Sequence, residues 1–128
     1  MKLSLTSFAY KLGIPANASM VFDARFLKNP YYDPELQHLT GLDTKVGPHI
    51  ESDPDFVAFY EQLCELSLLL LPRFAERDKD FAIAIGCTGG QHRSVYIVEK
   101  LGGFLSGNGY KFSITHRELE ESQSCEPR

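Results

Sequence analysis

The sequence predicts a single α/β domain built on a small, mostly parallel sheet that is flanked by helices. A short apolar run, Phe81–Ile85, is typical of a strand that is covered on both faces. Apolar residues at helical spacing follow it, and the expected elements alternate in the order strand, helix, strand, with helices of crossover length. A chain of 128 residues is long enough for one domain with a sizeable core.

Two strands with polar ends are expected in the first part of the chain. Apolar and small polar residues alternate from residue 3, which predicts a strand that ends near Tyr10, and residues 11–15 predict a turn. Residues 19–25 predict a second strand that finishes in charged residues. Asp23 and Arg25 lie two residues apart and therefore point to the same face of an extended chain. They are either a surface ion pair or part of a pocket wall.

A turn-rich connection and a long helix are predicted next. Tyr31 and Tyr32 are expected to cover an edge of the core, and the alternative is that they stack on a ring or a sugar. A short helix is predicted over Glu35–Leu39. Apolar residues then recur at helical spacing over residues 55–71, after a capping serine and two acidic residues. Pro72 is expected to end or kink this helix.

The glycine-rich segment Gly86–Gln91, between the apolar strand and the next helix, carries most of the chemical specificity. A strand, a tight glycine loop and a helix start form the geometry in which free backbone N–H groups bind an anion. Thr88 and Ser94 add hydroxyl groups, His92 adds an imidazole, and Arg93 adds a guanidinium that can bind two phosphate oxygens at once. We therefore predict a phosphate-binding loop, with an ordinary turn before a helix as the alternative.

The remaining elements complete the predicted domain. The pattern predicts a helix over His92–Ser106, which glycines end, and a last strand over Lys111–His116. We expect the domain to span residues 1–120 and a polar tail to span residues 121–128.

Composition narrows the classes of function. Seventeen acidic and thirteen basic residues give a net charge of −4, which argues against a strong nonspecific affinity for nucleic acid or an anionic membrane. Cys64, Cys87 and Cys125 show no paired spacing, so we expect a reducing compartment with neither a disulfide framework nor a zinc site. The histidines are scattered, and no metal or cofactor is expected. The apolar run Leu66–Leu71 is too short to span a bilayer and no signal peptide is evident, so we expect a cytoplasmic protein.

Several motifs closely resemble the C-terminal domain of the RapZ (YvcJ) family. The resemblance covers nearly the whole chain, and its most specific motifs are Ser7–Pro15, Val21–Pro30, Leu39–Asp43, Gly86–Ile97 and Thr115–Glu120. Full-length members of that family carry an N-terminal P-loop kinase-like domain. No P-loop motif occurs here, so we expect either the isolated domain or a free-standing relative.

The resemblance implies a fold like a subdomain of phosphofructokinase and a regulatory role rather than an enzymatic one. Studied members sense glucosamine-6-phosphate, bind a small RNA and present it to an endoribonuclease, as RNase adapters. Self-association is also implied. Position by position, the ligand would be bound by Asp23, Arg25, Asn29, Cys87, Thr88, Gly89, Gly90, Gln91, His92, Arg93 and Ser94.

The roles of these residues follow from the chemistry of the ligand. The loop N–H groups, Thr88, Ser94 and Arg93 are assigned to the phosphate. Asp23 is assigned to sugar hydroxyl groups or an ammonium group, because a carboxylate repels phosphate. Two departures from the family pattern bear on the ligand and the partner. Tyr31 stands where studied members use a histidine for the aminosugar, and residues 121–128 are acidic overall where RNA-binding members have a cluster of Lys and Arg.

An enzyme is the alternative hypothesis. Cys87 and Arg93, with five residues between them, have the spacing of cysteine-dependent phosphatases, in which a thiolate attacks phosphorus while loop N–H groups and the arginine hold the oxyanion. However, Gly86 stands where those enzymes usually have a histidine, and the sequence places no general acid convincingly. A domain that mainly binds protein or RNA partners is the third hypothesis.

Overall fold

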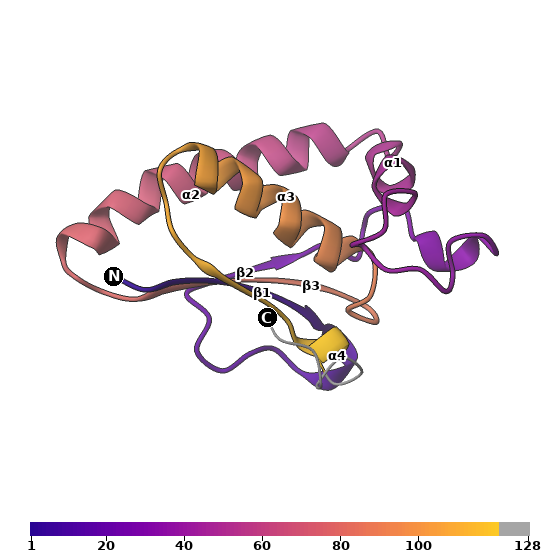
Figure 1. Cartoon of the computed structure of the whole chain (residues 1–128), viewed down its shortest axis with the longest axis horizontal. Helices are drawn as coiled ribbons and strands as arrows, with labels where there is room; N and C mark the ends of the chain where they lie inside the picture. Colours follow the sequence, from indigo (N-terminus) through magenta and orange to yellow (C-terminus); the bar gives the residue numbers. More distant parts are fainter. Residues whose placement is uncertain (121–128) are drawn as a thin grey trace.

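The computed structural model describes residues 1–120, in which a four-stranded sheet carries its long helices on one face (Figure 1). Every pair of neighbouring strands is parallel, which confirms the predicted α/β class. The predicted tail, residues 121–128, lies outside the described residues. The strands are β1 (Leu3–Ala9), β2 (Met20–Asp23), β3 (Phe81–Cys87) and β4 (Ser113–His116), in the spatial order β2-β3-β1-β4.

The helices form the second layer. The two long ones, α2 (Phe56–Glu76) and α3 (Arg93–Gly107), lie on the same side of the sheet (Figure 1). Apolar residues of the sheet, such as Leu5 and Ile83, are fully buried in one core with residues of these helices, such as Leu101. Shorter elements lie around the layers: η1 (Tyr10–Leu12), η2 (Pro30–Tyr32), α1 (Val46–Glu51) and α4 (Arg117–Glu120).

The connections after β1 and β3 leave these neighbouring strands on opposite sides of the sheet. The chain passes from β3 into α3 on the helical side, whereas residues 13–19, which follow β1 and η1, run over the other side (Figure 1). In open parallel sheets, such a divergence opens a crevice at the carboxyl ends of the two strands. The glycine loop and Lys11 both follow these strand ends, so the topology brings them together at the carboxyl end of the sheet.

The helix predicted over Glu35–Leu39 is wrong, because residues 34–38 form turns. The carbonyl groups that a helix would use accept hydrogen bonds from elsewhere: the side chain of Gln91 donates to Gln37, and that of His92 donates to Leu36. The sequence pattern does not predict α1, which contains Gly47 and a proline. A Cβ at Gly47 would lie 2.5 Å from the ring of Tyr96, so this short helix depends on close packing rather than on helix propensity.

Of the two outcomes expected at Pro72, an end or a kink of the long helix, the end is wrong, since α2 continues to Glu76. A proline in a helix removes one backbone hydrogen bond. Packing compensates in this last turn, because Leu71 is fully buried and the ring of Phe74 lies 4.5 Å from that of Phe81. Among residues 1–120, no helix combines the length and the apolar character needed to cross a membrane.

Candidate functional site

A pocket of about 290 Å³ lies at the carboxyl ends of the strands. We call it the loop pocket. Three segments line it: one follows β1, one follows β2, and the third is the glycine loop after β3. Its lining residues are Lys11, Asn29, Tyr31, Tyr32, Cys87, Thr88, Gly89, Gln91, His92 and Arg93.

The glycine loop has unused hydrogen-bond donors. Residues 88–92 belong to no helix or strand, and none of their backbone N–H groups donates to another described residue. Two residues after this segment, the N–H of Ser94 donates to the Cys87 sulfur at 3.4 Å. Backbone N–H groups gathered before a helix are a typical binding site for an oxyanion. The loop therefore has the free N–H donors that its glycine-rich sequence predicts.

Gly90 holds the loop in place, although it does not line the loop pocket. Its φ of 65° is unfavourable for other residues, and a Cβ there would lie 2.7 Å from Glu118 Cγ and 2.9 Å from the backbone nitrogen of Ala9. The carboxylate of Glu118 accepts a hydrogen bond from that same N–H of Ala9, at 2.6 Å. The loop is thus packed against the end of β1, with Glu118 of α4 as the support.

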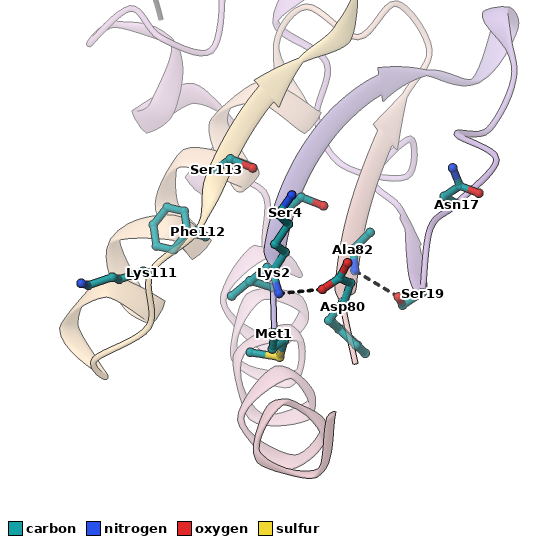
Figure 2. A pocket seen from close by; sticks show the side chains of 12 residues that line it. Met1, Lys2, Ser4, Asn17, Ser19, Asp80, Ala82, Lys111, Phe112 and Ser113 are labelled. Carbon is teal, nitrogen blue, oxygen red and sulfur yellow. Dashed lines mark hydrogen bonds between the residues drawn. The ribbon is translucent and has the colours of Figure 1, made fainter. Parts of the chain in front are cut away.

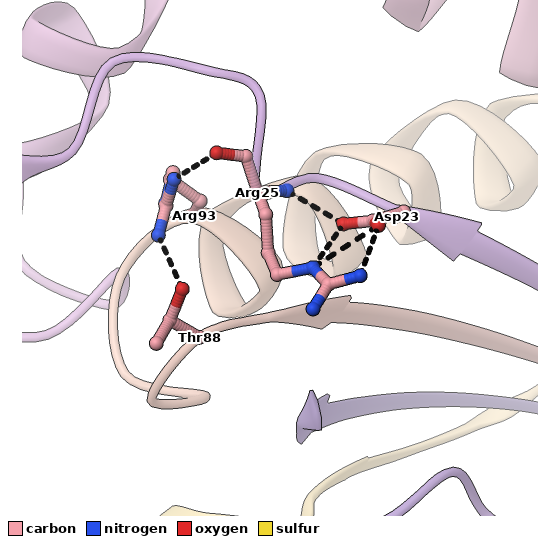
Figure 3. A network of polar contacts seen from close by, with 4 residues as sticks. All are labelled: Asp23, Arg25, Thr88 and Arg93. Atoms are coloured by element: carbon pink, nitrogen blue, oxygen red, sulfur yellow. Dashed lines mark hydrogen bonds and ion pairs between the residues drawn. The ribbon is translucent and has the colours of Figure 1, made fainter. Parts of the chain in front are cut away.

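Arg93 is buried, with only 4% of its surface exposed, and it joins the loop to the chain after β2. Its Nη1 donates to the carbonyl oxygens of Arg25 at 2.6 Å and Leu27 at 3.0 Å, and its Nη2 lies 3.4 Å from Thr88 Oγ1 (Figure 3). Its Nε is buried and has no partner among the described residues. Arg93 therefore positions the pocket wall and places a positive charge beside the loop.

Asp23 and Arg25 bind each other. Arg25 donates to both carboxylate oxygens of Asp23, the shortest contact being 2.7 Å (Figure 3), and its guanidinium lies 3.9 Å from the ring centre of Tyr10. The hydrogen bonds from Arg25 hold the pKa of Asp23 below its usual value, and the charge of Arg93 acts in the same direction. Neither side chain lines the loop pocket, so their contacts are those of a partly exposed ion pair at its edge.

Gln91 and His92 line the pocket, and their side chains form hydrogen bonds to the backbone of residues 36–39. Gln91 Nε2 donates to the carbonyl oxygens of Gln37 at 2.9 Å and Leu39 at 2.7 Å, and the His92 Nε2–H donates to that of Leu36 at 3.0 Å. Burial lowers the pKa of His92, so the imidazole is neutral at neutral pH. Both side chains fix the wall of the loop pocket in place.

Cys87 and Ser94 face each other behind the loop, with 3.1 Å between Sγ and Oγ. Cys87 lines the loop pocket and is 2% exposed, whereas Ser94 is fully buried and does not line it. The hydroxyl of Ser94 is therefore directed at the sulfur rather than toward the pocket.

Three lining residues were not assigned to the ligand from their chemistry. The sequence predicts Lys11 only as part of a turn, although its place just after β1 is a signal that points to the site. The expectation that both tyrosines cover a core edge is wrong: Tyr31 is 50% exposed and Tyr32 is 82% exposed. Both lie in η2, where the side chain of Asn29 caps the backbone N–H of Tyr31.

A larger hollow of about 740 Å³ lies at the opposite, amino ends of the strands (Figure 2). Its floor includes Ser4, Ala82 and Ser113, which stand in one register row on three neighbouring strands, and Lys2 and Lys111 also line it. The glycine loop that follows β3 lies at the other end of the sheet. Among residues 1–120, no group of His, Cys, Asp and Glu is arranged to hold a metal ion. Donor chemistry rather than volume therefore selects the loop pocket.

Comparison with known proteins gives consistent matches. The family model described as the RapZ C-terminal domain matches residues 1–120. A nucleotide-binding protein from Granulibacter bethesdensis is 54% identical over 120 residues, which make up 93% of this chain and 37% of that protein. One from Rhodospirillum centenum is 51% identical over 117 residues (91% and 35%), and one from Gluconobacter oxydans is 54% identical over 122 residues (93% and 38%). The chain thus spans less than half the length of these relatives.

Proposed function

Because this chain belongs to the RapZ C-terminal domain family, we propose that it is a regulatory domain that binds a sugar phosphate of the glucosamine-6-phosphate type in the loop pocket. One observation carries the proposal: the backbone N–H groups of residues 88–92 have no described acceptor, and four of these five residues line the pocket. Several backbone N–H groups in one loop can donate to the same phosphate, whose oxygens are strong acceptors.

The charges around the pocket support a phosphorylated ligand. Lys11 and Arg93 line it, and neither side chain forms an ion pair with a described carboxylate. The phosphate is assigned to the loop N–H groups, Thr88 and these two cations. Asn29, Tyr31 and Tyr32 are the residues placed to meet sugar hydroxyl groups. We assign Asp23 and Arg25 to the edge of the site, because Arg93 holds the carbonyl of Arg25.

The test is a ligand panel. Glucosamine-6-phosphate, glucose-6-phosphate, glucosamine, inorganic phosphate and ATP are compared by calorimetry and by the ligand-induced shift in melting temperature. We expect both sugar phosphates to bind, and we expect Lys11→Ala to lower their affinity. Lys111→Ala, at the other end of the sheet, is the control and should leave that affinity unchanged. Equal binding of inorganic phosphate would show a general anion site. If ATP were the only compound of the panel to bind, the proposed ligand would be a nucleotide instead of a sugar phosphate.

A phosphatase is the second candidate, because the N–H of Ser94 donates to the Cys87 sulfur that lines the pocket. Binding without turnover is favoured, since no Asp or Glu lines the loop pocket to protonate a leaving group. Arg93 is also held by two carbonyl groups. Hydrolysis of an aryl phosphate that disappears in Cys87→Ser would establish the enzyme.

We further propose the adapter role of the family, in which ligand binding acts on a small RNA and an endoribonuclease. Because the chain has a net charge of −4, we expect it to bind structured RNA more weakly than relatives with basic tails do. Submicromolar RNA binding with a steep salt dependence would contradict this expectation. Self-association is part of the same proposal, and sedimentation velocity measures it.

A further inference from the structure

A second hollow of about 530 Å³ adjoins the loop pocket. Asn29 and Tyr32 line both, so the two cavities meet at these side chains. Lys28 and His49 also line the second hollow. The loop pocket alone, at about 290 Å³, is at the lower limit for a small-molecule site, which spans roughly 300–1,000 Å³. A ligand that extends past Tyr32 would use both.

The residues at the junction have free groups for such a ligand. The Oδ1 of Asn29 accepts the backbone N–H of Tyr31 at 3.1 Å, which fixes the orientation of the amide. The amide nitrogen then faces away from that contact and donates to no described residue. Tyr32 is 82% exposed, and the ring of Tyr31 packs against it edge to face, so one flat face is open to a sugar ring.

The second hollow has a cation that lacks an ion pair. The ammonium group of Lys28 lies 3.4 Å from Ser52 Oγ, and no described carboxylate pairs with it. Its backbone N–H donates to Asp53 at 2.8 Å, which fixes the position of the main chain. Asp33, the one acidic residue that lines this hollow, accepts the N–H of Glu35 with its Oδ1. A cation is therefore available at each end of the joined cavities: Lys11 at the loop and Lys28 in the second hollow.

We propose that the loop pocket and the second hollow form one cleft for a hexose that carries a phosphoryl group at each end. One phosphoryl group binds the glycine loop, the sugar ring lies at Asn29 and Tyr32, and the second phosphoryl group binds Lys28. This inference rests on the proposed function, since the first phosphoryl group occupies the sugar-phosphate site. It specifies a hexose bisphosphate as the ligand class that the joined cleft prefers.

Calorimetry with glucose-6-phosphate and glucose-1,6-bisphosphate tests the inference. We expect the bisphosphate to bind at least about tenfold more tightly than glucose-6-phosphate, because one added charge-assisted contact provides a gain of that size. Lys28→Ala should lower bisphosphate affinity to that of the monophosphate and change monophosphate affinity less than about twofold. Lys111→Ala, at the opposite end of the strands, removes the same charge and should leave both affinities unchanged.

The outcomes separate this inference from the proposed function. Equal affinities for the two sugars, or a bisphosphate preference that survives Lys28→Ala, overturn the extended cleft and leave the loop pocket as proposed. Binding of neither sugar overturns both. A loss that Lys111→Ala reproduces would show an effect of net charge and also overturn the inference.

Discussion

Substituting Gly90 by alanine should destabilise the domain far more than the same change at Gly89. At Gly90 the φ of 65° is one that an L-residue adopts at a cost of about 1–2 kcal/mol. The added Cβ would also lie 2.9 Å from the nitrogen of Ala9 and 3.0 Å from the carbonyl carbon of Phe8, and β1 cannot move away without disturbing the sheet. Overpacking of this kind costs about 1–3 kcal/mol. Together we expect a loss of about 2–5 kcal/mol in the free energy of unfolding.

Gly89 is the matched control, because a Cβ there meets no atom within 4 Å and its φ is not in the left-handed region. Gly89→Ala should change the stability by less than about 0.5 kcal/mol. Urea denaturation of both variants, analysed at a common m-value, gives the comparison. If Gly90→Ala were as stable as Gly89→Ala, the close packing of the loop against β1 would be refuted.

Three further substitutions test the site and its supports. Arg93→Ala should lower sugar-phosphate affinity by about 1.5–3 kcal/mol, the range for hydrogen bonds to a charged group, and unchanged calorimetric affinity would remove Arg93 from the site. Burial lowers the pKa of His92 in the folded protein. As the pH falls below about 6.5, His92 is therefore protonated in the unfolded chain before it is protonated in the folded one, and the free energy of unfolding should decline. His92→Gln should flatten that decline in melting temperature, and an identical pH profile would contradict the assignment. Finally, His116 Nδ1 shares a hydrogen bond of 2.7 Å with the Ser7 hydroxyl, and its Nε2–H donates to Glu99 at 2.7 Å, so His116→Ala leaves a buried hydroxyl unpaired. We expect urea denaturation to show a loss of about 1–3 kcal/mol, clearly more than for Glu99→Ala on the exposed side of this network.

Periodicity and glycine placement were sufficient to locate the main elements of the site. The apolar run at β3, the helical spacing in α3 and the glycines between them depend on local sequence, and the structure has a strand, a loop and a helix there. The parallel order of the sheet followed from the length of the connections. The crevice was predictable for the same reason, since it follows from where parallel strands end.

The contacts that form the walls of the pocket were not predictable, because they join segments far apart in the chain. The failure of the predicted Glu35–Leu39 helix depends on Gln91 and His92, which bind carbonyl groups more than fifty residues away. The same holds for Arg93: its residue type indicated phosphate, but its Nη1 is bound to the carbonyl groups of Arg25 and Leu27. Side-chain hydrogen bonds of this kind have no periodic signal in a single sequence.

The most direct measurement is a titration followed by the backbone amide resonances of residues 88–92 in nuclear magnetic resonance spectra. Adding glucosamine-6-phosphate should shift these resonances in a saturable way, and adding glucosamine without the phosphate should leave them in place. Amide resonances that stay unchanged at saturating sugar phosphate, while other residues respond, would contradict the claim that the loop binds the phosphoryl group.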